Sequence, residues 1–515
     1  MAIAIQPDVA IVSPRLTSAR DSSVVYAGIV LGVDGAYSYP FVGQPPGVPG
    51  YQGRALLQQE HSAASAVCML VEGALFNELG GFDSDNFSLV GFDVDYSLRA
   101  LQHGRRIIWT PYTTLVYSGE AIDEMPGELA SGERQRWLDD TDALVERWLP
   151  VLANDPAYNR HLSLNDRRFA IDVEYAGRWD CYFHSRPRVL GLPLSSRLDD
   201  LRLGGPLKRL DEQALIQYQG LTPIESHKPE SVRAMTPVEL ERLKPDVFIL
   251  QGALSDKQLA EVERYRRFND CRIIFDLDAP EIGTDKRCGG MQMDMGNSLR
   301  RVLSCADRLW ASTSALADLY RDAVPDIRKV PNYLASSQWG GLQSRRRVAT
   351  KPRVGWAGSS RNHGDLEYIV EVVKATASEV EWVFMGMCLD ELRPYVSEVH
   401  GFAEHGAFPQ KLAALNLDLA IAPLEAHPDN AARSHLILLE YGILGWPVVC
   451  SDSYPYPDAP VTRVNNDVSS WLSAIRKRIH NPDATAAEGD KLRQWVLDNY
   501  MLEGHLDVHY QALMP

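Results

Sequence analysis

Two aspartates separated by one residue, Asp93 and Asp95, stand where a helix is expected to begin. Paired carboxylates at this spacing can hold a divalent cation against a diphosphate. One of them can instead take a proton from a hydroxyl group that acts as a nucleophile. The third interpretation is structural, because carboxylates in the first turn of a helix suit its dipole and its free N–H groups. The pair is therefore a candidate metal site, a candidate base or a helix start.

A second candidate site lies at 422–452, where a strand, a loop and a helix follow one another. The strand ends at Pro423, the loop contains Asn430 and the helix contains Glu440. Free N–H groups at the start of such a helix can bind a diphosphate, and the carboxylate of Glu440 can accept hydrogen bonds from two hydroxyls of a ribose. The alternative is an ordinary loop–helix–strand segment in which Glu440 lies on the surface.

A third candidate is the glycine-rich loop that follows the strand expected at 353–358. It contains Gly358, Ser359, Arg361 and His363, and a helix is expected from Asp365 onward. Arg361 or His363 can supply positive charge to an anionic ligand. The alternative is a turn that only caps the helix through Asp365.

Alternating strands and helices are expected to position the second and third candidates. From residue 187 the pattern predicts strands at 188–194, 245–252, 271–278 and 308–313, with helices between them. After a linker at 336–352, further strands are expected at 353–360, 380–386, 417–425 and 446–451. This pattern is typical of doubly wound α/β units with parallel sheets. Two such units leave a cleft, and ligands bind at the carboxyl ends of the strands.

The first 120 residues follow a different pattern, in which short strands are mixed with helices. An acidic stretch at 120–160 contains an amphipathic helix at 134–152 and is expected to connect two bodies. We therefore expect four segments: a partial unit at 1–120, a helical connector at 121–186, and two Rossmann-like domains at 187–335 and 336–515.

The composition limits the class of function. The net charge of −16 and the pI near 5.3 argue against nucleic acid as the main partner, since phosphate backbones bind to basic surfaces. Seven cysteines without a C-x-x-C pair predict reduced thiols in a cytoplasmic protein. No apolar run is long enough for a membrane span, and the first residues do not have the pattern of a signal peptide.

From about residue 188 onward, the chain resembles the retaining family 4 glycosyltransferases of the GT-B fold. The resemblance rests on matches to the motif of the donor-nucleotide site, which are Glu440, Gly445, Pro447, Val448 and Val449. Arg433-Ser434 fits the Lys-Ser pair of many bacterial relatives, whereas Ala432 replaces a family glutamate. The resemblance implies that Arg433 faces the diphosphate and that the 358–364 loop covers it. The expected donor-binding residues are Gly358, Ser359, Arg361, His363, Asn430, Arg433, Ser434, His435 and Glu440.

The acceptor side of this resemblance is weaker. Relatives often have an Asp-Asp pair where this chain has Asp278-Ala279, and Asp278 can approach an acceptor hydroxyl. The alternative is that Asp278 ends a strand and accepts backbone N–H bonds. The segment 195–207 stands where relatives have a glycine-rich loop, with Arg202 at its centre and Gly204-Gly205 late. The segment 330–334 resembles the interdomain hinge of the fold.

The first 120 residues resemble the second half of an inverting family 2 glycosyltransferase of the GT-A fold. The matches are Phe76, Gly80, Gly81, Phe82, Asp83, Asp93, Asp95, Arg99 and Gly104. The resemblance implies that Asp93 is the catalytic base. However, Phe92 replaces the family's glutamate, Tyr117 replaces a metal-binding histidine, and the nucleotide-binding half has no counterpart in the sequence. We therefore expect this unit to be inactive alone.

Together these resemblances imply an α/β chain in which a partial GT-A-like unit precedes a GT-B fold of two Rossmann-like domains. The expected activity is transfer of a hexose from a nucleotide sugar to a glycan or protein acceptor, without a metal or other cofactor. Asp278 and Asp93 are the candidate catalytic residues. A companion glycosyltransferase or a second copy of the chain is a candidate partner. The alternatives are a non-catalytic scaffold or glycan-binding partner, and a fragment of a longer protein.

Overall fold

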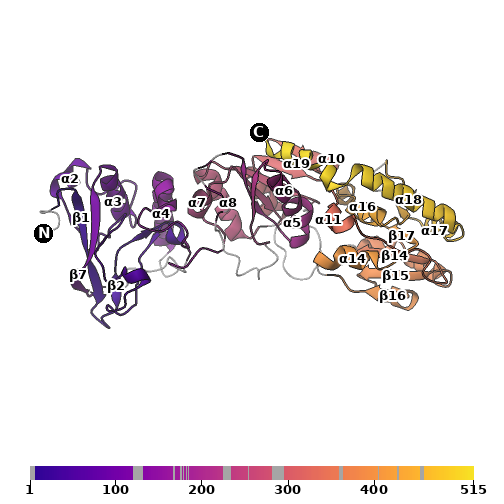
Figure 1. Ribbon diagram of the computed structural model, residues 1–515, viewed down its shortest axis with the longest axis horizontal. Coiled ribbons are helices and arrows are strands. Elements are labelled where there is room, and N and C mark those ends of the chain that lie inside the picture. Colours follow the sequence, from indigo (N-terminus) through magenta and orange to yellow (C-terminus); the bar gives the residue numbers. More distant parts are fainter. Residues whose placement is uncertain are drawn as a thin grey trace. The chain divides into compact units, whose positions relative to one another are not determined.

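Two compact units make up the chain, whose elements are labelled in Figure 1. The computed structural model describes residues 6–119, 131–165, 169–173, 177, 179–180, 183, 185–223, 234–252, 254–280, 295–358, 363–403, 405–425, 428–452 and 458–515. The first unit comprises Met1–His184, Arg233–Pro245 and Ala260–Cys271. The second comprises Ser185–Val232, Asp246–Leu259 and Arg272–Pro515.

The first unit contains a mixed sheet of short strands around two longer ones. β1 (Val9–Ser18) pairs in parallel with β7 (Arg106–Tyr117), and the order is β2-β1-β7-β5 with β6 also paired to β1. The short strands, β2 (Val24–Tyr26), β5 (Gln59–Glu60) and β6 (Leu70–Val71), all pair antiparallel. A separate pair is formed by β3 (Val30–Leu31) and β4 (Tyr37–Ser38). The helices are α2 (Gly73–Glu78), α3 (Phe92–Gln102), α4 (Ser131–Ala153) and α7 (Pro237–Leu243).

Helix α4 belongs to the core of the first unit. Its buried residues Leu144, Trp148 and Leu152 pack in one cluster with Val94 of α3 and Trp109 of β7. These apolar residues recur at helical spacing, so one face of α4 is removed from water. The amphipathic helix expected at 134–152 is thus confirmed, with three further residues before it and one after it.

The second unit begins with a six-stranded parallel sheet. Its strand order is β13-β12-β11-β10-β8-β9, and every neighbouring pair is parallel. The strands are β8 (Arg188–Leu192), β9 (Gln217–Gly220), β10 (Val247–Gln251), β11 (Arg272–Leu277), β12 (Arg308–Ala311) and β13 (Ile327–Lys329). The helices are α5 (Ser196–Arg202), α6 (Gly204–Glu212), α9 (Met295–Cys305) and α10 (Ser314–Leu319). Helix α8 (Asp256–Phe268) begins in this unit, and from Ala260 onward it belongs to the first unit. Near-continuous apolar runs form these strands because helices cover both faces of such a sheet.

A second six-stranded parallel sheet follows, with the order β16-β15-β14-β17-β18-β19. Its strands are β14 (Arg353–Gly358), β15 (Glu381–Gly386), β16 (Glu398–His400), β17 (Leu419–Ala422), β18 (Val448–Ser451) and β19 (Thr462–Val464). The strand order is that of a Rossmann sheet, and it reverses between β14 and β17. The helices are α11 (Ser336–Trp339), α12 (His363–Glu367), α13 (Val370–Thr376), α14 (Phe408–Ala413), α15 (Pro428–Ala431), α16 (Leu436–Ile443), α17 (Val468–Ile479) and α18 (Pro482–Asn499).

The last helix, α19 (Leu506–Leu513), returns to the first parallel sheet. Its residues Leu506 and Leu513 lie in the same buried cluster as Val189 of β8 and Ile249 of β10. The Trp310 indole N–H of β12 donates to the carbonyl oxygen of Ala512 at 3.2 Å. None of the described helices, α19 included, is long and apolar enough to cross a membrane.

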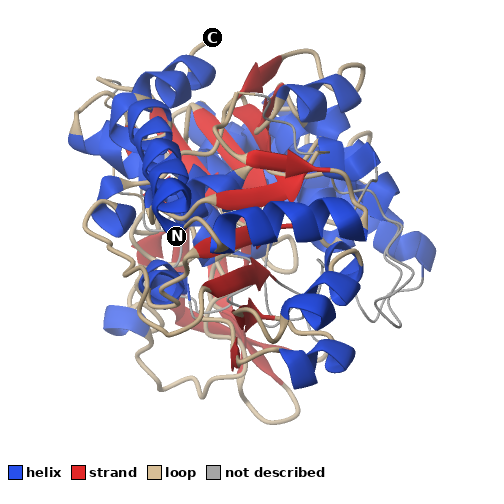
Figure 2. Cartoon of the chain, turned by 90° about the vertical axis from the view of Figure 1, so that its right-hand side faces the viewer, coloured by secondary structure: helices blue, strands red, loops and turns tan. Residues whose placement is uncertain are grey.

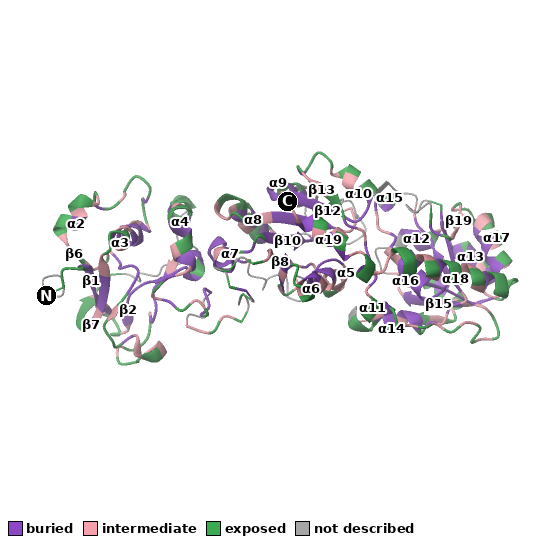
Figure 3. Cartoon of the chain, turned by 45° about the horizontal axis from the view of Figure 1, so that its top comes forward, coloured by how far each residue is buried: buried purple, intermediate pink, exposed green. Residues whose placement is uncertain are grey.

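The expected mixed α/β fold with parallel sheets is confirmed, and Figure 2 shows the red strands between blue helices. Figure 3 shows the same strands as buried and the outer faces of the helices as exposed. One expectation is wrong: the segment at 195–207 is not a glycine-rich loop, because it contains α5 and the beginning of α6. The GT-A-like character of the first unit remains a prediction.

Candidate functional site

A cavity lies at the carboxyl ends of β14 and β17, where the order of the second parallel sheet reverses. Counted out to the solvent, its volume is about 850 Å³. This is the position at which open α/β sheets bind their ligands. The residues that line it are Arg197, Ala357, Gly358, Met385, Phe402, Phe408, Leu424, Asn430, Arg433, Ser434, Leu436, Ile437 and Glu440. Of the expected donor-binding residues, the structure thus brings Gly358, Asn430, Arg433, Ser434 and Glu440 to one cavity.

Glu440 is the buried carboxylate of this cavity, with 5% of its surface exposed. It is carried by α16, which Tyr441 attaches to β14, since the Ala357 backbone N–H donates to the Tyr441 hydroxyl at 2.8 Å. The helix ends where Gly445 adopts a left-handed φ of 77°, a conformation that glycine takes without strain. Glu440 is therefore held in place by its own helix and is not the surface side chain of the alternative interpretation.

The ionisation of Glu440 depends on Arg197, which lies on α5. Burial raises the pKa of the Glu440 carboxyl, and the guanidinium of Arg197 opposes this rise. The two groups form an ion pair, with Arg197 Nη2 at 2.6 Å from Glu440 Oε1. Since a buried charge needs a partner, this pair is what keeps a carboxylate in an otherwise buried position.

Arg433 lies in the loop before α16 and is half-buried in the same cavity. Among the described residues, no carboxylate lies within ion-pair distance of its guanidinium. Its positive charge is thus available to an anion that enters the cavity. Asn430 is more constrained, because its amide N–H donates to the carbonyl oxygen of Glu425 at 2.9 Å.

Asn332, in the segment expected to be the interdomain hinge, connects the two parallel sheets beside the cavity. Its amide nitrogen lies 2.7 Å from Asp278 Oδ1 and 2.7 Å from Ser434 Oγ. A third bond comes from Arg202, which donates to the Asn332 amide oxygen at 2.7 Å. Asp278, expected on the acceptor side, and Ser434, expected on the donor side, are thus joined by one side chain.

Arg202 forms a buried ion pair behind this hinge. The exposed fractions of Arg202 and Asp276 are 1% each, and Arg202 Nε donates to Asp276 Oδ2 at 2.8 Å. The amide of Gln251 donates to the same oxygen at 2.7 Å. Both charges are therefore satisfied by neighbouring groups, as buried charges require. Arg202 is a structural residue of the first parallel sheet.

The other expected donor-binding residues lie elsewhere. His435 is buried against Tyr500, with ring centroids 4.8 Å apart, and does not line the cavity. Burial lowers the pKa of its imidazole to about 3, so the ring is neutral. Ser359 and Arg361 lie outside the described residues, as does the side chain of His363.

Two aromatic side chains that sequence reasoning missed line the cavity. Phe402 and Phe408 are stacked, with ring centroids 6.0 Å apart, and Phe402 is 50% exposed. The exposed ring of Phe402 offers a face on which a planar ligand can stack, whereas Phe408 is buried beneath it. No motif predicted them, because they come from a loop and a short helix between the expected strands.

Asp93 and Asp95 are buried in the first unit and are already bonded to protein groups. Helix α3 begins at Phe92, and Gly91 is its N-cap residue. Asp93 therefore lies in the first turn of the helix, and the expectation that Asp93 caps the helix is wrong. Asp93 accepts backbone N–H bonds from Ala66 and Val94, and burial raises the pKa of its carboxyl.

Asp95 accepts bonds from the side chains of Arg99, Arg147 and Trp148. Arg99 in turn donates to the carbonyl oxygens of Leu79 and Gly81. Three of the residues that match the family 2 motif, Gly81, Asp95 and Arg99, thus belong to one internal hydrogen-bonded network. In the described part of the chain, no group of three or more His, Cys, Asp or Glu side chains is placed to hold a metal ion.

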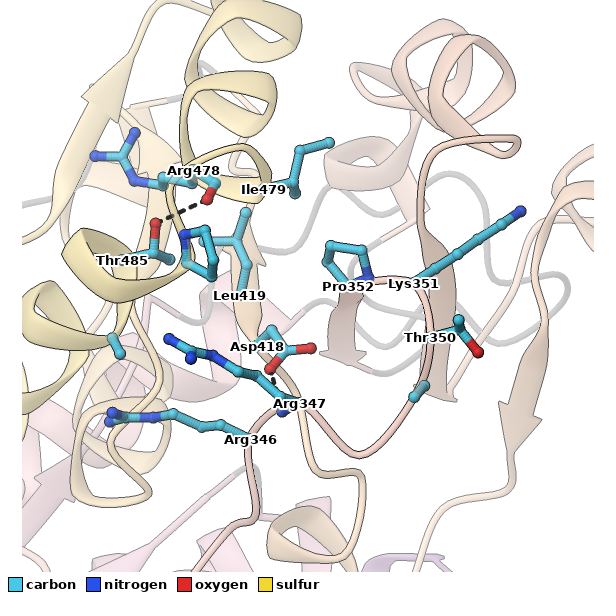
Figure 4. Close-up of a pocket in the computed structure, with 13 residues that line it drawn as sticks. Arg346, Arg347, Thr350, Lys351, Pro352, Asp418, Leu419, Arg478, Ile479 and Thr485 are labelled. Carbon is cyan, nitrogen blue, oxygen red and sulfur yellow. Dashed lines mark hydrogen bonds between the residues drawn. The ribbon is translucent and has the colours of Figure 1, made fainter.

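A second cavity, of about 770 Å³, lies at the amino ends of β14 and β17 (Figure 4). Its basic side chains are mostly paired: Arg346 with Asp490, Arg347 with Asp483, and Arg478 with Glu488. The carboxylate of Asp418 accepts the backbone N–H of Arg347 at 2.7 Å. This cavity is on the side of the sheet away from the strands' carboxyl ends, so the first cavity is the better candidate.

No family model matches the chain. It is 30% identical to the O-antigen biosynthesis protein RfbC of Myxococcus xanthus over 163 residues, which are 31% of this chain and 12% of RfbC. It is 28% identical to the uncharacterized protein y4gI of Sinorhizobium fredii over 179 residues, 35% of this chain and 19% of y4gI. The matches thus span less than a fifth of either relative.

Two solved structures are similar in their folds. Sucrose-phosphate synthase from Thermosynechococcus elongatus has a TM-score of 0.46 at 12% identity, with 63% of this chain and 98% of that chain covered. Anabaena HepE, solved in complex with UDP-glucose, has a TM-score of 0.42 at 13% identity, with 63% and 97% covered. At these TM-scores, the fold assignment rests on the strand order and parallel pairing described above.

Proposed function

We propose that the chain is a glycosyltransferase that binds a nucleotide sugar in the cavity at the carboxyl ends of β14 and β17. It would transfer the hexose to a glycan or protein acceptor, as in the assembly of bacterial surface polysaccharides or glycoproteins. The observation that carries the proposal is the buried carboxylate of Glu440 in the same cavity as the cation of Arg433, at the strand reversal of a Rossmann sheet.

Each residue has a chemical task in this proposal. Glu440 accepts hydrogen bonds from the ribose hydroxyls, and Arg433 binds the diphosphate. The ring of Phe402, which stacks on Phe408, is offered to the base. Asp278 would face the acceptor, and its bond to Asn332 would set its orientation.

The proposal needs no metal cofactor, because arginine can offset the charge that develops on a diphosphate leaving group. The type of site proposed is that of retaining family 4 enzymes of the GT-B fold. The names of two similar proteins support a role in sugar transfer: RfbC is an O-antigen biosynthesis protein, and HepE was solved with UDP-glucose. The first unit would be inactive, since Asp93 is buried and bonded to backbone amides.

A non-catalytic scaffold or glycan-binding partner is the second candidate function. It is favoured by the replacements at family positions, Ala432 and Ala279 in the second unit and Phe92 and Tyr117 in the first. Such a chain would assist a companion glycosyltransferase or a second copy of itself.

Thermal unfolding with UDP, GDP, TDP, CMP and their sugars tests the binding site. A ligand at one hundred times its Kd should stabilise the protein by about 2.7 kcal/mol. Glu440→Gln and Arg433→Gln should reduce the rise in Tm, whereas Arg345→Gln removes the same charge from an exposed position and should leave it unchanged. If none of these ligands raises the Tm, the proposed donor site is excluded.

Hydrolysis of the stabilising nucleotide sugar distinguishes the enzyme from the scaffold. The enzyme should release the nucleotide slowly even without an acceptor, and a chelator should leave that rate unchanged. Binding without any turnover, with or without candidate acceptors, would favour the scaffold.

A further inference from the structure

Arg197 lines the same cavity as Arg433, but it lies on a helix that follows a strand of the first parallel sheet of the second unit. It is the second residue of α5, which follows β8 and is capped by the hydroxyl of Ser195. Its guanidinium bonds to Glu440 at 2.6 Å and lies over the ring of Phe408, 4.6 Å from the centroid. An element of one sheet thus reaches the expected ribose-binding carboxylate of the other.

The ion pair between Arg197 and Glu440 uses only part of the guanidinium. An arginine has five N–H donors, and in the described part of the chain one of them, at Nη2, bonds to Glu440. The Arg197 side chain is 38% exposed, whereas that of Glu440 is 7% exposed. The remaining donors are therefore accessible to a molecule that enters the cavity.

The charges of the cavity also require a second cation. Its described lining has two cations, Arg197 and Arg433, and one carboxylate, Glu440. While the cavity is empty, Glu440 offsets the charge of Arg197. A diphosphate brings about two negative charges, and in the described lining Arg433 alone offsets only one of them.

We propose that Arg197 exchanges partners when a nucleotide sugar binds: it leaves Glu440 for the diphosphate, and Glu440 turns to the ribose hydroxyls. Arg197 is then a donor-binding residue that the first parallel sheet supplies to a site built on the second. The exchange couples occupancy of the cavity to the contact between the two sheets. This inference rests on the proposed function, because it requires a nucleotide in the cavity.

Binding measurements in two backgrounds test the exchange. Affinities are measured for whichever of UDP, GDP and TDP stabilises the wild type most, and for the matching nucleoside. Arg197→Gln and Arg197→Lys are made in the wild type and in Glu440→Gln. The second background removes the carboxylate, so any effect of Arg197 that persists there does not act through Glu440. Tm values without ligand show that each variant is folded.

In the Glu440→Gln background, Arg197→Gln should weaken the binding of the nucleoside diphosphate about tenfold or more, because a charge-assisted hydrogen bond is lost. The affinity for the nucleoside should stay unchanged. Arg197→Lys should lose less affinity for the diphosphate than Arg197→Gln, because lysine keeps the positive charge. No loss in that background would show that Arg197 acts only through Glu440, and an equal loss for nucleoside and diphosphate would show that Arg197 does not contact the diphosphate. Either result would overturn the inference.

The outcomes separate the two proposals. If the wild type binds no nucleotide, the proposed function fails. If the wild type binds a diphosphate and Arg197→Gln in the Glu440→Gln background binds it equally well, only the exchange is wrong. A wild type that binds CMP and none of the diphosphates would also overturn the exchange.

Discussion

Glu440 is informative at the scale of a single residue, because its burial and its charge oppose each other. Burial favours the protonated form, and the ion pair with Arg197 favours the carboxylate. Removal of the Arg197 cation would leave the buried charge of Glu440 without a partner. We therefore expect the two side chains to be coupled in stability as well as in binding.

The first prediction concerns the pH dependence of stability. Because the pKa of Glu440 is raised in the folded state, the folded chain keeps a proton between the ordinary pKa near 4.5 and the raised value, where the unfolded chain has lost it. The free energy of unfolding therefore falls as the pH rises through that window. Glu440→Gln removes this component, so urea unfolding at roughly pH 4 to 7 should show the variant gaining stability relative to the wild type. A constant difference would contradict the raised pKa.

The second prediction concerns Asn332. Asn332→Leu leaves Asp278, Ser434 and Arg202 without one bond each, and two of these bonds involve charged groups. The free energy of unfolding should fall by about 1–3 kcal/mol or more. Asn499→Ala removes an exposed asparagine with one bond to the Trp495 carbonyl, and should change stability by less than about 0.5 kcal/mol. If urea unfolding shows the same loss of stability in Asn332→Leu and Asn499→Ala, the contacts of Asn332 are weak.

At the scale of elements, α16 shows what the sequence predicts well. Its apolar run and the glycine after it indicated a helix that ends near Ile443, and the structure has that end. Glu440 was placed on it correctly, and Asn430, Arg433 and Ser434 were brought to the same cavity. Such local signals suffice because the helix, its stop and the next strand are adjacent in the sequence.

Helix α5 shows what the sequence could not predict. Its most deeply buried residue is an arginine, Arg202, so the hydropathy pattern of an amphipathic helix is inverted at that position. The partners that make this burial possible, Asp276 and Asn332, come from distant parts of the chain. The contact of Arg197 with Glu440 likewise spans 243 residues of sequence. Short-range patterns carry no information about such pairs.

The third prediction belongs to the end of α16. Gly445→Ala forces an L side chain into a left-handed backbone conformation, which costs about 1–2 kcal/mol. Its Cβ would also lie 2.8 Å from Arg346 Nη2. Gly445→Asn should lose less stability, since asparagine tolerates this conformation better. Gly341→Ala should lose little stability, because its Cβ would meet no neighbouring atom. Thermal or urea unfolding gives the order, and an alanine variant as stable as the wild type would contradict it.

At the scale of the whole molecule, the two units differ in what their expected sites can do. The site in the second unit is an open cavity with an available cation, whereas Asp93 and Asp95 of the first unit are buried and bonded to protein groups. The sequence indicated both sites by motif, but only a three-dimensional structure shows which of them is open to a ligand.

The fourth prediction follows from that difference. A bound nucleotide should slow the hydrogen exchange of backbone amides in α16 and α5 of the second unit. Exchange in α3 and β1 of the first unit should not change, because no residue of that unit lines the described cavity. Mass spectrometry with and without the nucleotide measures both. Protection confined to α3 would place the donor beside Asp93 instead.

The return of α19 to the first parallel sheet has a consequence for the chain during its synthesis. The ribosome makes β8 well before the second sheet, and α19 comes after both. Until Leu506 and Leu513 leave the exit tunnel, the apolar residues that they cover in the first sheet are exposed on the nascent chain. Domains usually fold in the order in which they are translated. The sheet that begins with β8 therefore receives part of its apolar cover only after the second sheet has been made.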